Sequence, residues 1–189
     1  MKKLIILISI ISTLLITTSC SYFNSTAINV GYGKDTMFGN LSKAGEERSY
    51  SINDVSVEFI RDYDVWSTSL ELSLINHEYK YKKPDMLTQA TSLTTKVWLI
   101  RNFKYDDINL FAGAGVGMGY INPTNDNKYL ANTHVISDLG IRVGIQKTFE
   151  WFNLRLEYMF RHFSGIWEDD SGENEDEVRI GVVIPLGRR

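Results

Sequence analysis

A histidine, a serine and an aspartate near the end of this chain have the residue types of a hydrolytic triad. His162 and Ser164 are separated by one residue, and Asp176 follows the serine by twelve positions. A serine hydroxyl becomes a useful nucleophile when a neighbouring imidazole removes its proton. A carboxylate can fix the tautomer of that imidazole and stabilise the imidazolium that forms. The three residues therefore fit the serine-hydrolase template.

The two segments that carry these residues alternate between apolar and polar side chains, as β-strands do. Side chains on a strand alternate between its faces, so His162 and Ser164 project on the same side. They continue an apolar face made of Phe152, Leu154, Leu156, Tyr158 and Phe160. Asp176 begins the apolar face of the next segment, which continues with Val178, Ile180, Val182, Ile184 and Leu186. We therefore expect three polar groups at the ends of the apolar faces of adjacent strands, a site for an apolar substrate.

Length, charge and motifs narrow the function classes. A chain of 189 residues predicts a single domain. The formal net charge of −3 and the lack of a basic stripe argue against a nucleic acid as partner. No phosphate loop, Gly-x-Ser-x-Gly elbow or cysteine-based metal spacing occurs in the sequence, so we expect no cofactor and no metal.

The first segment, Met1–Ser19, has the pattern of an export signal, with two lysines before an apolar core. That core is too short for a flanked membrane span. Cys20 follows directly and is the only cysteine, so no intramolecular disulfide can form. Its position resembles a lipoprotein cleavage site, and both lipidation of Cys20 and an ordinary cleaved signal stay open. The sequence predicts a signal peptide over residues 1–19 and one β-barrel domain over residues 20–189.

The rest of the chain shows recurrent alternation bounded by turn residues, which predicts an all-β protein. We expect eight strands, at Ser25–Gly33, Ser49–Ile60, Val65–His77, Ala90–Asn102, Asp107–Tyr120, Asn132–Thr148, Phe152–Ser164 and Glu177–Leu186. Strands of about ten residues suit a tilted crossing of a bilayer, and eight is the smallest barrel number. The pattern indicates an eight-stranded antiparallel β-barrel.

Connection lengths favour one kind of barrel. Three connections are tight: Arg61–Asp64, Phe103–Asp106 and Phe149–Glu150. Four are long and polar: Lys34–Arg48, Glu78–Gln89, Ile121–Ala131 and Gly165–Asp176. Short periplasmic turns alternating with long outer loops are typical of outer-membrane barrels. Alternation alone would also fit a lipocalin-like barrel, with its apolar face inside.

A membrane barrel with a periplasmic N-terminus fixes where the three residues lie. Odd-numbered strands then run outward, so His162, Ser164 and Asp176 fall near the outer end, on the lipid-facing side. The outer leaflet there consists of lipopolysaccharide, which becomes the candidate substrate. The alternative is that His162 and Ser164 lie beyond the membrane boundary, where polar residues are ordinary.

These residues are also where the chain resembles the lipid A 3-O-deacylase family of outer-membrane enzymes, the PagL-like proteins. The similarity covers roughly Asn109–Leu186 and includes the Gly-rich Phe111–Gly117, the segment Leu154–Ser164, Asp176 and the final strand. The resemblance implies an eight-stranded barrel that hydrolyses the 3-O-linked acyl chain of lipid A without a metal. It also implies that Ser164 is the nucleophile, His162 the base and Asp176 the orienting acid.

The chain departs from the family pattern at two positions. The family usually has a glutamate where Asp176 stands, so the carboxylate here is one methylene shorter. It usually has an asparagine directly after the serine, where this chain has Gly165. A backbone N–H at Gly165 could still stabilise the oxyanion.

The sequence thus predicts an outer-membrane serine esterase acting on lipid A within lipopolysaccharide. Two alternatives stay open: a non-enzymatic surface barrel for adhesion or envelope integrity, and a lipocalin-like lipid-binding lipoprotein. A homodimer is also left open. Of the remaining candidates, His77 fits a loop edge, His134 a lumen hydrogen-bond network, and the acidic Glu168–Glu177 a solvated loop.

Overall fold

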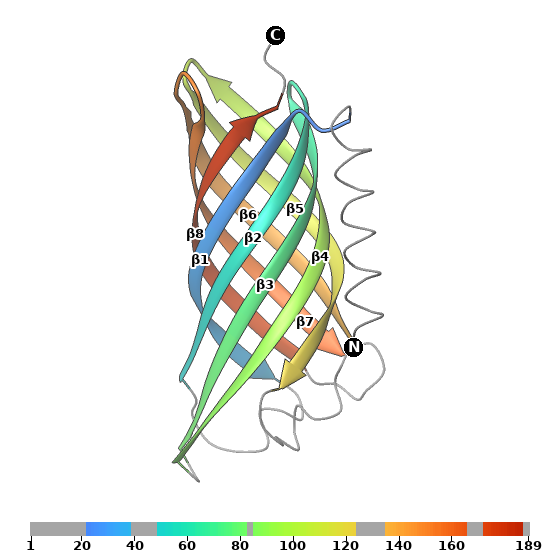
Figure 1. Ribbon diagram of the computed structural model, residues 1–189, viewed down its shortest axis with the longest axis vertical. Coiled ribbons are helices and arrows are strands. Elements are labelled where there is room, and N and C mark those ends of the chain that lie inside the picture. The colour runs from blue at the N-terminus through green and yellow to red at the C-terminus, as the bar shows by residue number, and fades with distance from the viewer. Residues whose placement is uncertain (1–21, 39–48, 83–84, 124–134, 166–171, 187–189) are drawn as a thin grey trace.

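The computed structural model describes residues 22–38, 49–82, 85–123, 135–165 and 172–186. They form a closed antiparallel barrel in which each strand pairs with its neighbours in the sequence and β1 pairs with β8 (Figure 1). The strands are β1 (Ser25–Phe38), β2 (Ser49–Tyr63), β3 (Trp66–Lys82), β4 (Asp85–Tyr105), β5 (Ile108–Pro123), β6 (Val135–Thr148), β7 (Asn153–Gly165) and β8 (Gly172–Pro185). The predicted all-β, eight-stranded antiparallel barrel is confirmed.

One end of the barrel, here the turn end, carries three tight connections. Asp64 and Asp106 adopt positive φ angles of 68° and 47° in two of them, a conformation that aspartate tolerates better than most residues. In the third, the Phe149 N–H donates to the Phe152 carbonyl at 2.9 Å. The tight turns expected from the sequence are therefore present.

The opposite end, here the loop end, differs from expectation. The stretch Glu78–Gln89 is not a long loop, because β3 and β4 stay paired from Glu78↔Gln89 to Lys82↔Asp85. They form a hairpin that projects past the other strands (Figure 1). Strand β8 also begins at Gly172 rather than Glu177, so Asp176 belongs to a strand and not to a loop.

The barrel wall has an apolar outside and a polar inside. Side chains such as Val116, Ile141 and Ile180 are 58–63% exposed on the exterior, while Glu71, Arg161 and Arg179 are fully buried in the lumen. Water-filled or ion-paired interiors under an apolar band are the arrangement of barrels that cross the bacterial outer membrane. The protein is therefore a transmembrane β-barrel of the bacterial outer membrane. The lipocalin-like alternative is wrong, because it needs the apolar face inside.

Ion pairs fill the middle of the lumen. Arg155 lies 2.6 Å from Glu58, which also pairs with Arg142. Glu71 lies 2.7 Å from Arg161 and 3.1 Å from Arg179, and Lys96 lies 2.5 Å from Asp138. Burying such groups is costly unless each meets opposite charge, and here the charges compensate one another. The predicted polar lumen is confirmed.

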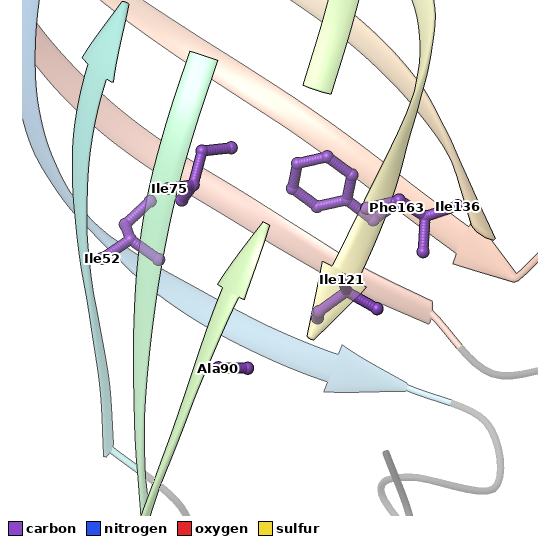
Figure 2. Packing of buried hydrophobic residues seen from close by; sticks show 6 residues of the cluster. All are labelled: Ile52, Ile75, Ala90, Ile121, Ile136 and Phe163. Atoms are coloured by element: carbon purple, nitrogen blue, oxygen red, sulfur yellow. The ribbon is translucent and has the colours of Figure 1, made fainter. Parts of the chain in front are cut away.

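An apolar layer closes the lumen toward the loop end. It consists of Ile52, Ile75, Ala90, Ile121, Ile136 and Phe163 (Figure 2). His77 packs against Phe163 with ring centroids 6.2 Å apart, and its ring lies 2.8 Å from the Ser92 hydroxyl and 3.3 Å from Glu175. The prediction that His77 is a loop-edge residue is wrong, since its side chain is only 1% exposed.

Some sequence predictions fall outside the described residues. These are the signal peptide Met1–Ser19, Cys20, His134 and the first part of the acidic stretch. Within the described ranges, no helix is long and apolar enough to cross a membrane.

Candidate functional site

The alternation of β7 turns His162 and Ser164 out of the barrel. Their neighbours Arg161 and Phe163 are 0% and 3% exposed and point into the lumen. Arg161 is held there by Glu71, and Phe163 by the apolar layer (Figure 2). A slip of one residue would expose both anchors, so the outward direction of His162 and Ser164 is strongly fixed. The expected outward direction of His162 and Ser164 is confirmed.

Asn174 is the cross-strand neighbour of His162. The two residues are paired in the β7–β8 register, and the His162 Nδ1 lies 2.9 Å from the Asn174 Oδ1. An amide oxygen only accepts hydrogen bonds, so Nδ1 carries the proton and donates it. In the neutral imidazole, a proton on Nδ1 leaves Nε2 with the lone pair that a general base requires.

Ser164 is joined to a second serine on the neighbouring strand. Its register partner on β6 is Ser137, and the two Oγ atoms lie 2.8 Å apart. The Ser137 hydroxyl also lies 3.2 Å from the Ser164 carbonyl oxygen, to which it can donate. Either hydroxyl can be the donor of the Oγ–Oγ hydrogen bond, which ties the Ser164 hydroxyl to Ser137.

Asp176 lies on the same outer face but one step from the position that faces His162. Its register partner on β7 is Phe160, and its carboxylate accepts a hydrogen bond from the Tyr158 hydroxyl. Diagonal neighbours on a sheet are roughly 7–8 Å apart, so Asp176 remains close to His162 without facing it. On its other side, Asp176 pairs with Lys34 of β1.

Gly165 and the adjacent glutamates complete the predicted region. Gly165 is the last residue of β7 and pairs with Ile136. Glu175 and Glu177 are 0% and 1% exposed and lie in the lumen. Neither glutamate shares the outer face with His162, as the alternation predicted.

The site belongs to a ring where the outer surface changes from apolar to polar. On each strand, one outward side chain toward the loop end is polar and follows an apolar or aromatic outward side chain two positions deeper. The members, called the polar ring below, are Lys34, Asn53, Asn76, Thr91, Asn122, Ser137, His162 and Asp176. The residues two positions deeper on the same strands are Tyr32, Val55, Leu74, Leu93, Tyr120, Leu139, Phe160 and Val178. The polar ring marks the upper boundary of the lipid-facing band.

Sequence reasoning missed Asn174, Ser137 and Tyr158 as partners of the three predicted residues. Asn174 has the same parity as Asp176, so an earlier start for the last strand would have found it. Ser137 could be assigned only once the β6–β7 register was known. The structure thus unites His162 with Asn174, Ser164 with Ser137, and Asp176 with Tyr158.

Comparisons with known proteins support the fold. No family model and no curated protein sequence matches this chain. Its structure is similar to that of Neisserial surface protein A (NspA), at 11% identity and a TM-score of 0.54, over 85% of this chain and 96% of that one. It is also similar to the outer membrane enzyme PagL, at 12% identity and a TM-score of 0.56, over 85% of this chain and 99% of that one. At these identities the two likenesses show a shared barrel architecture and nothing finer.

Proposed function

We propose that this barrel is an outer-membrane esterase that removes the 3-O-linked acyl chain of lipid A. The observation that carries the proposal is the oriented imidazole of His162, fixed by Asn174 on the lipid-facing wall two residues from Ser164. An imidazole held in the basic tautomer beside a serine is the core of the hydrolase template. The resemblance of Leu154–Ser164 to the lipid A deacylase family adds to this support.

The height of the site on the barrel suits an ester of a membrane lipid. Ester groups of lipids lie where hydrocarbon meets headgroup, and the polar ring marks that boundary on the protein. With the loop end toward the cell exterior, His162 and Ser164 would meet the acyl esters of lipopolysaccharide in the outer leaflet. The alternative explanation, that polar residues here merely face the interface, predicts the same location without hydrolysis.

The proposed reaction follows from the atoms present. The Ser164 Oγ attacks the ester carbonyl while the His162 Nε2 takes its proton, and the oxyanion is stabilised by a backbone N–H near Gly165. The imidazolium then protonates the sugar oxygen as its bond to the carbonyl carbon breaks, so the sugar leaves as an alcohol and an acyl-serine remains. Water, activated by the same imidazole, hydrolyses that acyl-serine and restores the enzyme.

The orienting role has two candidates in this proposal. Asn174 accepts the observed hydrogen bond from Nδ1, and an asparagine is also the partner of the catalytic histidine in papain-like proteases. Asp176, the acid predicted from the sequence, would need to leave Tyr158 to reach the same nitrogen. We assign the orienting role to Asn174 and keep Asp176 as the competing prediction.

Mass spectrometry of lipid A from cells that express the protein tests the proposal. The parent barrel should remove one hydroxyacyl chain, and Ser164→Ala should leave lipid A unchanged. Thr91→Ala is the matched control, because it deletes a side-chain hydroxyl of the polar ring on β4, away from His162 and Ser164. Heat-modifiable migration in detergent should show that all three barrels are folded.

Unchanged lipid A with a folded parent barrel would favour a non-enzymatic surface barrel. The hydrogen bond between Ser164 and Ser137 and the neutral partner of His162 are the observations that favour this second candidate. A chain loss that persists in Ser164→Ala would instead reject Ser164 as the nucleophile.

A further inference from the structure

Arg101 occupies an unusual position on the lipid-facing wall near the turn end. Its guanidinium lies 4.9 Å from the ring centroid of Trp66 on β3 and 5.7 Å from that of Phe103 on β4. Both rings are about half exposed on the exterior. Stacking on two aromatic rings at a membrane interface fixes the plane and direction of the guanidinium.

Other cations at this end have protein partners. Lys104 lies 3.1 Å from Asp64, Lys147 lies 3.5 Å from Asp107, and Arg61 donates to the Tyr22 carbonyl at 2.5 Å. Arg101 forms neither an ion pair nor a hydrogen bond with any described residue. The half-buried Arg101 side chain on the outer face thus keeps its hydrogen-bonding capacity for a ligand. A guanidinium fork matches the oxygens of a phosphate.

An apolar groove begins beside Arg101 and runs along the outer wall. It has a volume of about 640 Å³, and its lining includes Phe103, Leu110, Val143, Ile145, Leu156 and Tyr158. Phe103 thus contacts the guanidinium at one end and lines the groove at the other. The register partner of Arg101 on β5 is Ala112. Because this side chain is small, it does not block a ligand that approaches Arg101 from the β5 side.

We propose that Arg101 and this groove bind a glycerophospholipid of the leaflet at the turn end. The phosphate would accept hydrogen bonds from the guanidinium between Trp66 and Phe103, and one acyl chain would lie in the groove. The two halves of the site match the two halves of such a lipid: an anion at the interface and an apolar chain that extends into the bilayer. This inference is independent of the proposed esterase activity.

Native mass spectrometry of the folded barrel in mild detergent provides the test. Dioleoyl phosphatidylglycerol is titrated against the parent, Arg101→Gln and Lys104→Gln. Lys104→Gln removes the same charge from the same strand and end, but from a cation that already has a carboxylate partner. We expect the affinity of Arg101→Gln to fall about tenfold or more, since hydrogen bonds to charged groups are among the stronger ones, and that of Lys104→Gln to stay near the parent's.

Two further probes identify the ligand. Dioleoylglycerol, which lacks the phosphate, and glycerol 3-phosphate, which lacks the chains, should each bind the parent at least tenfold more weakly than the phospholipid. Equal binding of phosphatidylglycerol to the parent and to Arg101→Gln would overturn the proposal. The proposal would also be overturned if the parent bound dioleoylglycerol or glycerol 3-phosphate as tightly as it binds phosphatidylglycerol. Heat-modifiable migration confirms that each variant is folded before titration.

Discussion

The Nδ1 atom of His162 lies 2.9 Å from the Oδ1 atom of Asn174, directly across the β7–β8 pair. This relationship places a neutral amide where a serine hydrolase commonly has a carboxylate. An amide can fix the imidazole tautomer, but it stabilises the imidazolium less than a charged partner does. The proposed enzyme should therefore depend on Asn174 for orientation and turn over slowly.

Substitutions at Asn174 and Asp176 should separate the two candidates for the orienting role. Asn174→Ala should lower the rate of lipid A deacylation about 10²-fold or more, because His162 loses the contact that fixes its tautomer and direction. Asp176→Asn should change the rate less than about threefold, since its carboxylate is bonded to Tyr158. Rates in mixed micelles provide the measurement. A larger loss of rate in Asp176→Asn than in Asn174→Ala would assign the orienting role to Asp176 instead.

Removing the Ser137 hydroxyl should free the nucleophile. The two hydroxyls share a hydrogen bond, so Ser137→Ala leaves the Ser164 hydroxyl free to donate to the His162 Nε2. The deacylation rate should equal or exceed that of the parent, while the barrel loses about 1 kcal/mol of stability with the hydrogen bond. The same micelle assay and a urea titration measure both quantities. A rate loss of tenfold or more would show instead that Ser137 positions the nucleophile.

The extent of the lipid-facing band can be tested by placing an arginine at either of two positions on the same strand and comparing the folding free energies. Val116 is 63% exposed in the middle of the outer face of β5, and Asn122 lies on the same face in the polar ring. Val116→Arg should cost about 2–4 kcal/mol of folding free energy in vesicles, and Asn122→Arg about 0–1 kcal/mol. Equal costs would mean that the polar ring does not mark the membrane boundary.

The lumen ion pairs should control the stability of the barrel. Glu71→Gln removes the carboxylate that lies 2.7 Å from Arg161 and 3.1 Å from Arg179, and should destabilise the barrel by about 3–5 kcal/mol. Lys147→Gln, the matched control, breaks an ion pair whose partners are both 55% exposed and should cost less than about 1 kcal/mol. Urea midpoints followed by tryptophan fluorescence give both values. Similar midpoints would contradict the assigned role of the network.

Alternation and connection lengths sufficed to predict the barrel and the outer position of His162 and Ser164. Both signals are local, and the period of two is visible in a short window of sequence. The choice between an apolar interior and an apolar exterior depended on the pattern of long and short connections. The distribution of exposed side chains confirms that choice.

The local pattern misled at Glu175 and His77. A run rich in glutamate resembles a solvated loop, yet Glu175 lies in the lumen 3.3 Å from the His77 ring. These charges come from strands about 100 residues apart in the sequence, so no window could show that they compensate each other. Because the acidic run was interpreted as a loop, the last strand was predicted to start too late. Asn174 was then left out of the strand and was not considered as the partner of His162.

The lumen network also constrains the order in which the chain can be assembled. Glu58 and Glu71 come from the second and third strands, while their arginine partners follow 84 to 108 positions later, on β6, β7 and β8. A nascent chain that has inserted only β1–β4 into the bilayer would carry these acidic groups with Lys96 as the one buried lysine or arginine among the residues described in those strands. The lumen charges are therefore neutralised at the stage at which β1 pairs with β8 and the barrel closes. The barrel should insert as a nearly complete sheet rather than hairpin by hairpin.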